Sequence, residues 1–218
     1  MPWTDELWPF VIQLYQKKPS GIKPMYSRDT VRLALELHIP PQVIYQKMFR
    51  LRQPLPPSLE RLMETVGKSP KKLSTMCRKL RSLNGMGNAG EFYDNVKVCE
   101  TFELDFRPVN APTAQMTGRP LMTPVMLIMI LDLYFRLIPA TMVEETPDVR
   151  DMARMLDIRP EDIVYVLEIF LRCDPFVETP GDIDDPMLEP CKKIWCRYAY
   201  DDPMILSNLA RQLEYYWK

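Results

Sequence analysis

Residues 27–44 read SRDTVRLALELHIPPQVI, and residues 146–163 read TPDVRDMARMLDIRPEDI. The two stretches align without a gap at a constant offset of 119 residues. In both, apolar side chains recur at the three- and four-residue spacing of an amphipathic helix, and a proline then begins a second helical pattern. Each stretch is therefore predicted to form two short helices joined by a tight turn.

The similarity extends outward over residues 4–52 and 123–171, in which 9 of 49 aligned positions are identical. Chance identity at average composition is roughly 6%. A second block, residues 70–83, matches residues 203–216 at five positions with an offset of 133, so the second copy contains 14 additional residues. The chain is therefore predicted to hold two copies of one helical unit.

Helical periodicity predicts about five helices in each copy. The expected helices of the first copy are 8–15, 29–37, 41–52, 59–66 and 71–83, and those of the second are 127–134, 148–156, 160–172, 191–200 and 204–217. Three residues are candidate N-caps: Ser27, Thr123 and Thr146. The sequence thus predicts an all-α fold with two pseudo-repeated multi-helix units, residues 1–83 and 122–218.

A connector of different composition, residues 84–121, separates the two copies and contains four of the seven glycines. Within it, apolar and acidic residues alternate: Phe102, Glu103, Leu104, Asp105 and Phe106. Alternation with a period of two is typical of a short strand. An extended arm lying across the helices is the alternative interpretation.

The formal net charge of −1 conceals an asymmetry between the two halves. Residues 1–110 contain 17 Lys/Arg and 11 Asp/Glu, a net of +6, whereas residues 111–218 contain 11 Lys/Arg and 18 Asp/Glu, a net of −7. The first copy is therefore basic and the second acidic.

The sequence predicts a cytoplasmic protein that does not enter a membrane. Asp5 and Glu6 stand where a secretory leader would be basic and then apolar. The longest apolar run, residues 121–138, is interrupted by Asp132 and Arg136 and is predicted to be a buried core helix. The five cysteines form no CxxC pair, which is typical of reduced core residues.

No pattern of an enzyme, a cofactor site or a metal site stands out. His38 is the one histidine of the chain, and a lone histidine in a helix turn is more often structural than catalytic. The tripeptide Gly67-Lys68-Ser69 resembles the end of a phosphate-binding loop, but Leu62 stands where that loop needs its first glycine. The sequence therefore favours a non-enzymatic protein without a cofactor.

Each repeated stretch resembles the helix-turn-helix family of DNA-binding motifs. The family has a small residue in its first helix, a glycine four residues later in the turn and a branched apolar residue six beyond that. The matching triplets are Ala34, His38 and Ile44 in the first copy and Ala153, Asp157 and Ile163 in the second. Both copies lack the turn glycine, and Lys47 occupies a position that the family keeps apolar.

The resemblance implies that the second helix of the first copy enters a major groove of DNA, or binds RNA. Gln42, Gln46 and Arg50 would then read base edges, with Lys47 and Arg52 near phosphates. The stretch 41–81 has a net charge of +8, an electrostatic footprint for a polyanion. The further basic candidates of this stretch are Lys71, Lys72, Arg78 and Lys79.

A protein-interaction or self-association module is the alternative, with the basic and acidic units facing each other. The helix that contains Gln42 is apolar around more than half its girth, which is unusual for a recognition helix. The corresponding helix of the second copy carries Glu161, Asp162 and Glu168, which would repel phosphate. The chain as a whole also resembles bacterial proteins of unassigned function, which implies no particular chemistry.

Overall fold

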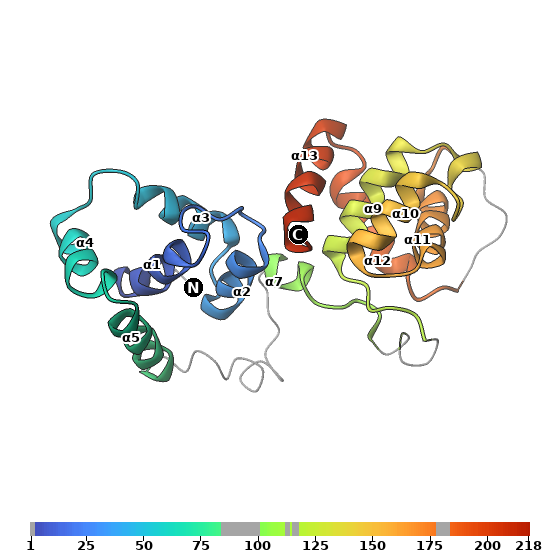
Figure 1. The fold of residues 1–218 in the computed structure, drawn as a ribbon. Coiled ribbons are helices and arrows are strands. Elements are labelled where there is room, and N and C mark those ends of the chain that lie inside the picture. The colour runs from blue at the N-terminus through green and yellow to red at the C-terminus, as the bar shows by residue number, and fades with distance from the viewer. Residues whose placement is uncertain (1–2, 84–100, 112–113, 115–117, 178–183) are drawn as a thin grey trace. The chain divides into compact units, whose positions relative to one another are not determined.

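The computed structural model describes residues 3–83, 101–111, 114, 118–177 and 184–218, and all regular structure in these ranges is helical. The predicted all-α class is therefore confirmed. The chain divides into two compact units, unit 1 (Met1–Glu100) and unit 2 (Thr101–Lys218), which are coloured blue to green and green to red in Figure 1. Each unit has its own apolar core, so each can be understood by itself.

Unit 1 is built around α1 (Trp8–Gln16), which follows the single turn η1 (Asp5–Leu7) and packs against three other helices. Six of the nine α1 residues are buried, because neighbours contact this helix on several sides. Over residues 17–83, the remaining elements of unit 1 are α2 (Arg28–Leu37), α3 (Pro41–Arg50), α4 (Pro57–Leu62), the π-helical turn η2 (Met63–Gly67) and α5 (Pro70–Leu83).

The α2–α3 hairpin is fixed by a small crossing residue and a left-handed turn. Ala34 of α2 and Ile44 of α3 are both fully buried. His38 ends α2 with φ 54°, ψ 38°, and the next N–H, that of Ile39, donates to the carbonyl oxygen of Ala34 at 3.0 Å. This arrangement closes the helix end in the manner of a Schellman motif. Pro41 then begins α3.

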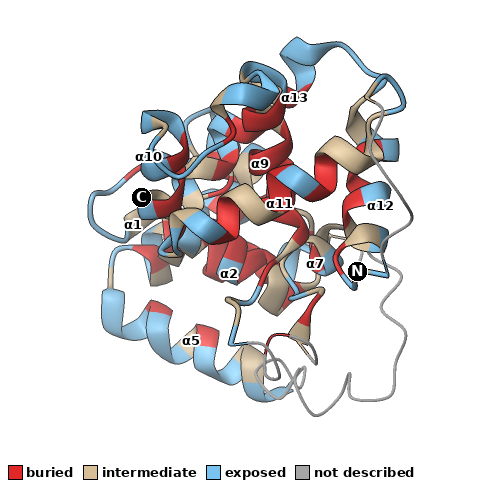
Figure 2. Cartoon of the chain, turned by 90° about the vertical axis from the view of Figure 1, so that its right-hand side faces the viewer, coloured by how far each residue is buried: buried red, intermediate tan, exposed pale blue. Residues whose placement is uncertain are grey.

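Unit 2 is built around α9 (Pro124–Arg136), of which ten of 13 residues are buried. In Figure 2 this helix is almost continuously red. It contacts α10, α11, α12 and α13, and none of the described helices is both long and apolar enough to cross a bilayer. The other elements with described bounds are α7 (Thr101–Asp105), η3 (Pro139–Thr141), α10 (Pro147–Leu156), α11 (Pro160–Cys173), α12 (Leu188–Tyr198), α13 (Pro203–Leu213) and η4 (Glu214–Tyr216).

The hairpins of the two units agree in their local backbone. α10 begins and ends 119 residues after α2 begins and ends, and α11 begins 119 residues after α3 begins. Asp157 has φ 58°, ψ 45°, close to the values of His38, and the N–H of Ile158 donates to the carbonyl oxygen of Ala153 at 3.0 Å. The agreement covers the hairpins, and the repeat of the whole unit stays a prediction.

The strand predicted around Phe102 to Phe106 is wrong, because this segment forms the one-turn helix α7. The apolar residues do not share one buried face: Leu104 is 45% exposed, whereas Glu103 is buried. Asp105 accepts two hydrogen bonds from the guanidinium of Arg197 on α12, at 2.7 and 3.0 Å. This contact ties the short helix to α12 within unit 2. Residues 84–100 of the predicted connector lie outside the described residues.

All three predicted N-caps stand at the N-cap position of their helices, and two of them make the capping hydrogen bond. The hydroxyl of Ser27 accepts a hydrogen bond from the N–H of Thr30, and that of Thr123 accepts one from the N–H of Met126, both at 3.4 Å. Thr146 makes no side-chain cap, because its hydroxyl donates to the carbonyl oxygen of Thr141 at 2.6 Å. Thr146 thus stands at the predicted N-cap position of α10 but makes no capping side-chain hydrogen bond.

Candidate nucleic-acid interface

The candidate interface is the outer face of α3, which we call the α3 face and define as Gln42, Gln46 and Arg50. These three residues are spaced by four, so they lie one above another on the helix, and all three are exposed. Ile44 and Met48 occupy the opposite side and are fully buried. The helix thus has a packed inner side and a polar outer side.

Two of the three side chains of the α3 face have local hydrogen-bond partners. The amide of Gln42 donates to the hydroxyl of Tyr26 at 2.9 Å, and the guanidinium of Arg50 donates to the amide oxygen of Gln53 at 2.8 Å. Among the described residues, Gln46 has no such partner. Arg50 and Gln46 could therefore turn toward a ligand without breaking a contact of the core.

Lys47 differs from its neighbours, because it is half-buried between aromatic rings. Its ammonium nitrogen lies 4.6 Å from the ring centroid of Trp3 and 5.5 Å from that of Trp8. This is a cation–π contact, which stabilises the charge without a carboxylate. Lys47 therefore helps to pack Trp3 and α1 against α3, and its replacement would not test the outer face alone.

Arg52 follows α3 in the turn and is exposed. Its Nε donates to the hydroxyl of Tyr15 at 3.4 Å. The positive charge of this residue therefore lies next to the C-terminal end of α3, where it can add to the charge of Arg50.

The remaining candidates form a separate surface on α5, the α5 basic row, which consists of Lys71, Lys72, Arg78 and Lys79. All four residues are exposed. Three of them line a surface hollow of about 380 Å³ together with Thr75 and Met76. In Figure 1, α3 and α5 lie on opposite sides of α1. The structure therefore does not bring the nine predicted residues into one site.

The corresponding face of α11 in unit 2 is acidic and largely closed. At the offset of 119, the α3 face corresponds to Glu161, Tyr165 and Ile169, and Ile169 is only 4% exposed. The hydroxyl of Tyr165 donates to Asp185 at 2.7 Å, and α12 packs against α11. The outer face that α3 exposes is therefore absent from α11.

Tyr165 shows how tightly this face of α11 is closed. Burial and the hydrogen bond to the Asp185 carboxylate raise the pKa of its phenol well above the ordinary value near 10. The guanidinium carbon of Arg119 lies 3.5 Å from the centroid of its ring. The edge of a DNA base could reach the Tyr165 side chain only after Asp185 and Arg119 had moved.

Sequence reasoning missed Tyr26 and the pocket between α1 and α2 described below. Tyr26 lies 16 residues before Gln42, in a loop without periodicity, so only the folded hairpin shows their contact.

Among the described residues, no group of three or more His, Cys, Asp or Glu side chains could hold a metal ion.

The chain matches no model of a known protein family, and its comparison with curated proteins and with solved structures finds no similar protein.

Proposed function

We propose that the protein binds duplex DNA through unit 1, with the α3 face turned toward the major groove. The observation that supports this most directly is that Gln42, Gln46 and Arg50 are all exposed on the second helix of a hairpin. Amide and guanidinium groups form paired hydrogen bonds to adenine and guanine edges in the major groove. A-form RNA has a narrow, deep major groove that side chains do not read, so DNA is the favoured duplex.

The charge of unit 1 supports the same proposal. Residues 3–83 contain 15 Lys/Arg and 6 Asp/Glu, a net charge of +9. Phosphate contacts supply most of the affinity of proteins for DNA without a preferred sequence, with dissociation constants of about 10⁻⁴ to 10⁻⁶ M at physiological salt. We expect affinity in this range for a duplex of arbitrary sequence.

The test is the binding of a fluorescently labelled duplex, followed by anisotropy at 50 and 200 mM salt. The double variant Gln46→Glu/Arg50→Glu places two carboxylates on the α3 face without touching the core, and we expect it to weaken binding about tenfold or more. Lys47 stays unchanged, because it packs against Trp3 and Trp8. Absence of binding by the native chain at low salt would overturn the proposal.

The matched control is Arg211→Glu/Gln212→Glu on α13 of unit 2. It makes the same two residue changes and the same change in net charge at exposed positions. We expect its affinity to stay within about twofold of the native value, because these two residues belong to unit 2 and are not part of the proposed interface. Equal losses in both double variants would show that only net charge matters.

The α5 basic row gives a second, weaker arm of the experiment. Replacing Lys71, Lys72 and Lys79 by glutamine removes three positive charges from the side of α1 opposite to α3. We expect a smaller loss of affinity than in the α3-face variant, because these lysines attract the duplex only at a distance. A larger loss would move the proposed interface to α5.

The opposite charges of the two units favour a second candidate, self-association through the basic surface of one chain and the acidic surface of another. Residues 1–100 have a net charge of +7 and residues 101–218 a net charge of −8. Complexes held by such complementarity weaken as salt is added. Light scattering at 20 and 500 mM salt tests this candidate, which predicts dimers or larger species that dissociate at the higher concentration.

A further inference from the structure

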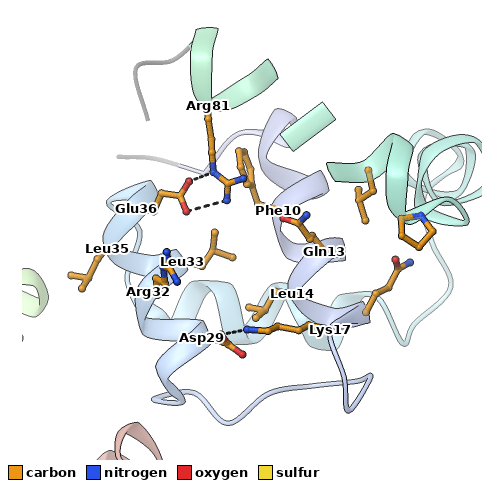
Figure 3. Close-up of a pocket in the computed structure, with 13 residues that line it drawn as sticks. Phe10, Gln13, Leu14, Lys17, Asp29, Arg32, Leu33, Leu35, Glu36 and Arg81 are labelled. Atoms are coloured by element: carbon orange, nitrogen blue, oxygen red, sulfur yellow. Dashed lines mark hydrogen bonds and ion pairs between the residues drawn. The ribbon is translucent and has the colours of Figure 1, made fainter. Parts of the chain in front are cut away.

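A pocket of about 930 Å³ lies in unit 1 between α1 and α2 and reaches α5 (Figure 3). Its apolar lining comes from all three helices: Phe10 and Leu14 of α1, Leu33 of α2 and Leu73 of α5. These four side chains are at least nine-tenths buried and form the apolar floor of the pocket. The volume falls within the range of about 300–1,000 Å³ that is usual for small-molecule sites.

Two ion pairs connect the walls of this pocket. Lys17, at the end of α1, bonds to Asp29 of α2, and Arg81 of α5 bonds to Glu36 of α2. Figure 3 shows the two pairs at opposite ends of the opening, with Leu33 and Leu14 between them. The guanidinium carbon of Arg81 also lies 5.1 Å from the centroid of the Phe10 ring. The pairs thus limit the opening at both ends.

The side chains that line the pocket include one more cation than carboxylate. The carboxylates of Asp29 and Glu36 are each neutralised by one of the two ion pairs. Arg32 of α2 lies between them in sequence, is exposed and lines the same pocket. No ion pair joins Arg32 to a described residue. A guanidinium at the mouth of an apolar pocket is matched by a ligand with one negative charge.

We propose that this pocket binds a small organic anion, with its apolar body on the leucine and phenylalanine floor and its carboxylate, sulfonate or phosphate group on Arg32. The amides of Gln13 and Gln16 also line the pocket and supply neutral hydrogen-bond donors. A backbone phosphate of a nucleic acid would contact only Arg32 and would leave Phe10 and Leu14 uncovered, so a compact anion with an apolar body fits the pocket better. The inference therefore does not rest on the proposed binding of DNA.

The experiment uses two fluorescent probes that share one apolar body. Anilinonaphthalene sulfonate carries the negative charge, and N-phenyl-1-naphthylamine is the same body without it. The full-length chain is titrated with each probe. We expect Arg32→Gln to weaken the sulfonate about five- to tenfold, the size of a partly exposed charge-assisted hydrogen bond, and to leave the uncharged probe within twofold.

Two further variants separate this pocket from other apolar surfaces of the chain. Gln13→Trp, at a half-buried lining position, fills the pocket and should weaken both probes by at least tenfold. Arg61→Gln on α4 removes an exposed arginine that does not line the pocket, and should change neither probe. Unchanged melting temperatures would show that the variants are folded.

The proposal is overturned if Gln13→Trp leaves both affinities unchanged, because the probes then bind elsewhere. It is also overturned if Arg32→Gln weakens the two probes equally, because the arginine then does not recognise charge. The probe experiment contains no DNA, so its outcome is independent of the experiment on the α3 face.

Discussion

The α2–α3 hairpin of unit 1 and the α10–α11 hairpin of unit 2 begin at residues 119 apart, and each turns through a left-handed residue. Ala34 and Ala153 are both buried at the crossing of the two helices. Ile44 and Ile163 are both fully buried in the second helix. The buried positions and the turn therefore give the same local backbone, although the charges of the two hairpins differ.

The two hairpins differ in the number of helices that pack on their second helix, α3 in unit 1 and α11 in unit 2. α11 is contacted by α9, α10 and α12, so the position that corresponds to Arg50 is the buried Ile169. α3 is contacted by α1 and α2, and its outer face stays exposed within unit 1. The comparison teaches that a hairpin pattern fixes the backbone, whereas the helices that follow it decide whether the second helix is a surface or part of a core.

The largest effect on stability is expected at the buried position of α11, and the exposed position of α3 that corresponds to it serves for comparison. Ile169→Ala should lower the free energy of unfolding of unit 2 by about 2–5 kcal/mol, because it leaves a cavity in the core of the unit. Arg50→Ala should change the stability of unit 1 by less than about 0.5 kcal/mol, because the side chain is exposed.

Native-state hydrogen exchange measures these changes separately, since it reports on amides of α3 and α11 in the same sample. Ile44→Ala is the control for unit 1, because this side chain is fully buried and its loss should cost as much as that of Ile169. A loss of several kcal/mol in Arg50→Ala would contradict the open face of α3.

The second prediction concerns what the hairpins share. A left-handed backbone costs most residues with a Cβ roughly 1–2 kcal/mol; His and Asp adopt it more readily than most, and a β-branched side chain tolerates it least. His38→Val and Asp157→Val should therefore each lower the free energy of unfolding by about 1–2 kcal/mol. Thermal melting followed by circular dichroism measures the change. Asp157→Gly is the control and should keep or raise stability, because glycine adopts positive φ without strain.

Sequence reasoning predicted the all-α class and the hairpins because their signal is local. The apolar spacing of residues 29–37 and the proline at position 41 contain enough information for α2 and α3. The missing turn glycine weakened the resemblance to helix-turn-helix proteins. In the structure, His38 and Asp157 adopt the left-handed conformation that a glycine would favour.

Features that depend on distant residues were not predictable in the same way. The alternation around Leu104 looks like a strand, but Asp105 is held by Arg197, which lies 92 residues away. Lys47 was expected near phosphate, yet the rings of Trp3 and Trp8 hold it. The pocket at Arg32 depends on the separation of α1 and α2, which no periodicity in the sequence records.

The smallest expected effect compares Gln46 with Tyr165, its counterpart in unit 2. Tyr165→Phe removes the hydrogen bond to Asp185 and should cost unit 2 about 1 kcal/mol, whereas Gln46→Ala should change unit 1 by less than about 0.5 kcal/mol.

The raised pKa of Tyr165 adds a pH signature. Folding holds this phenol protonated, so its contribution is complete below the unfolded pKa near 10 and decreases as the pH rises above that value. In a titration followed at 295 nm, Tyr165→Phe should leave the absorbance change of the native protein below pH 11 unaltered. A smaller change in the variant would mean that Tyr165 ionises normally and that the outer face of α11 is as open as that of α3.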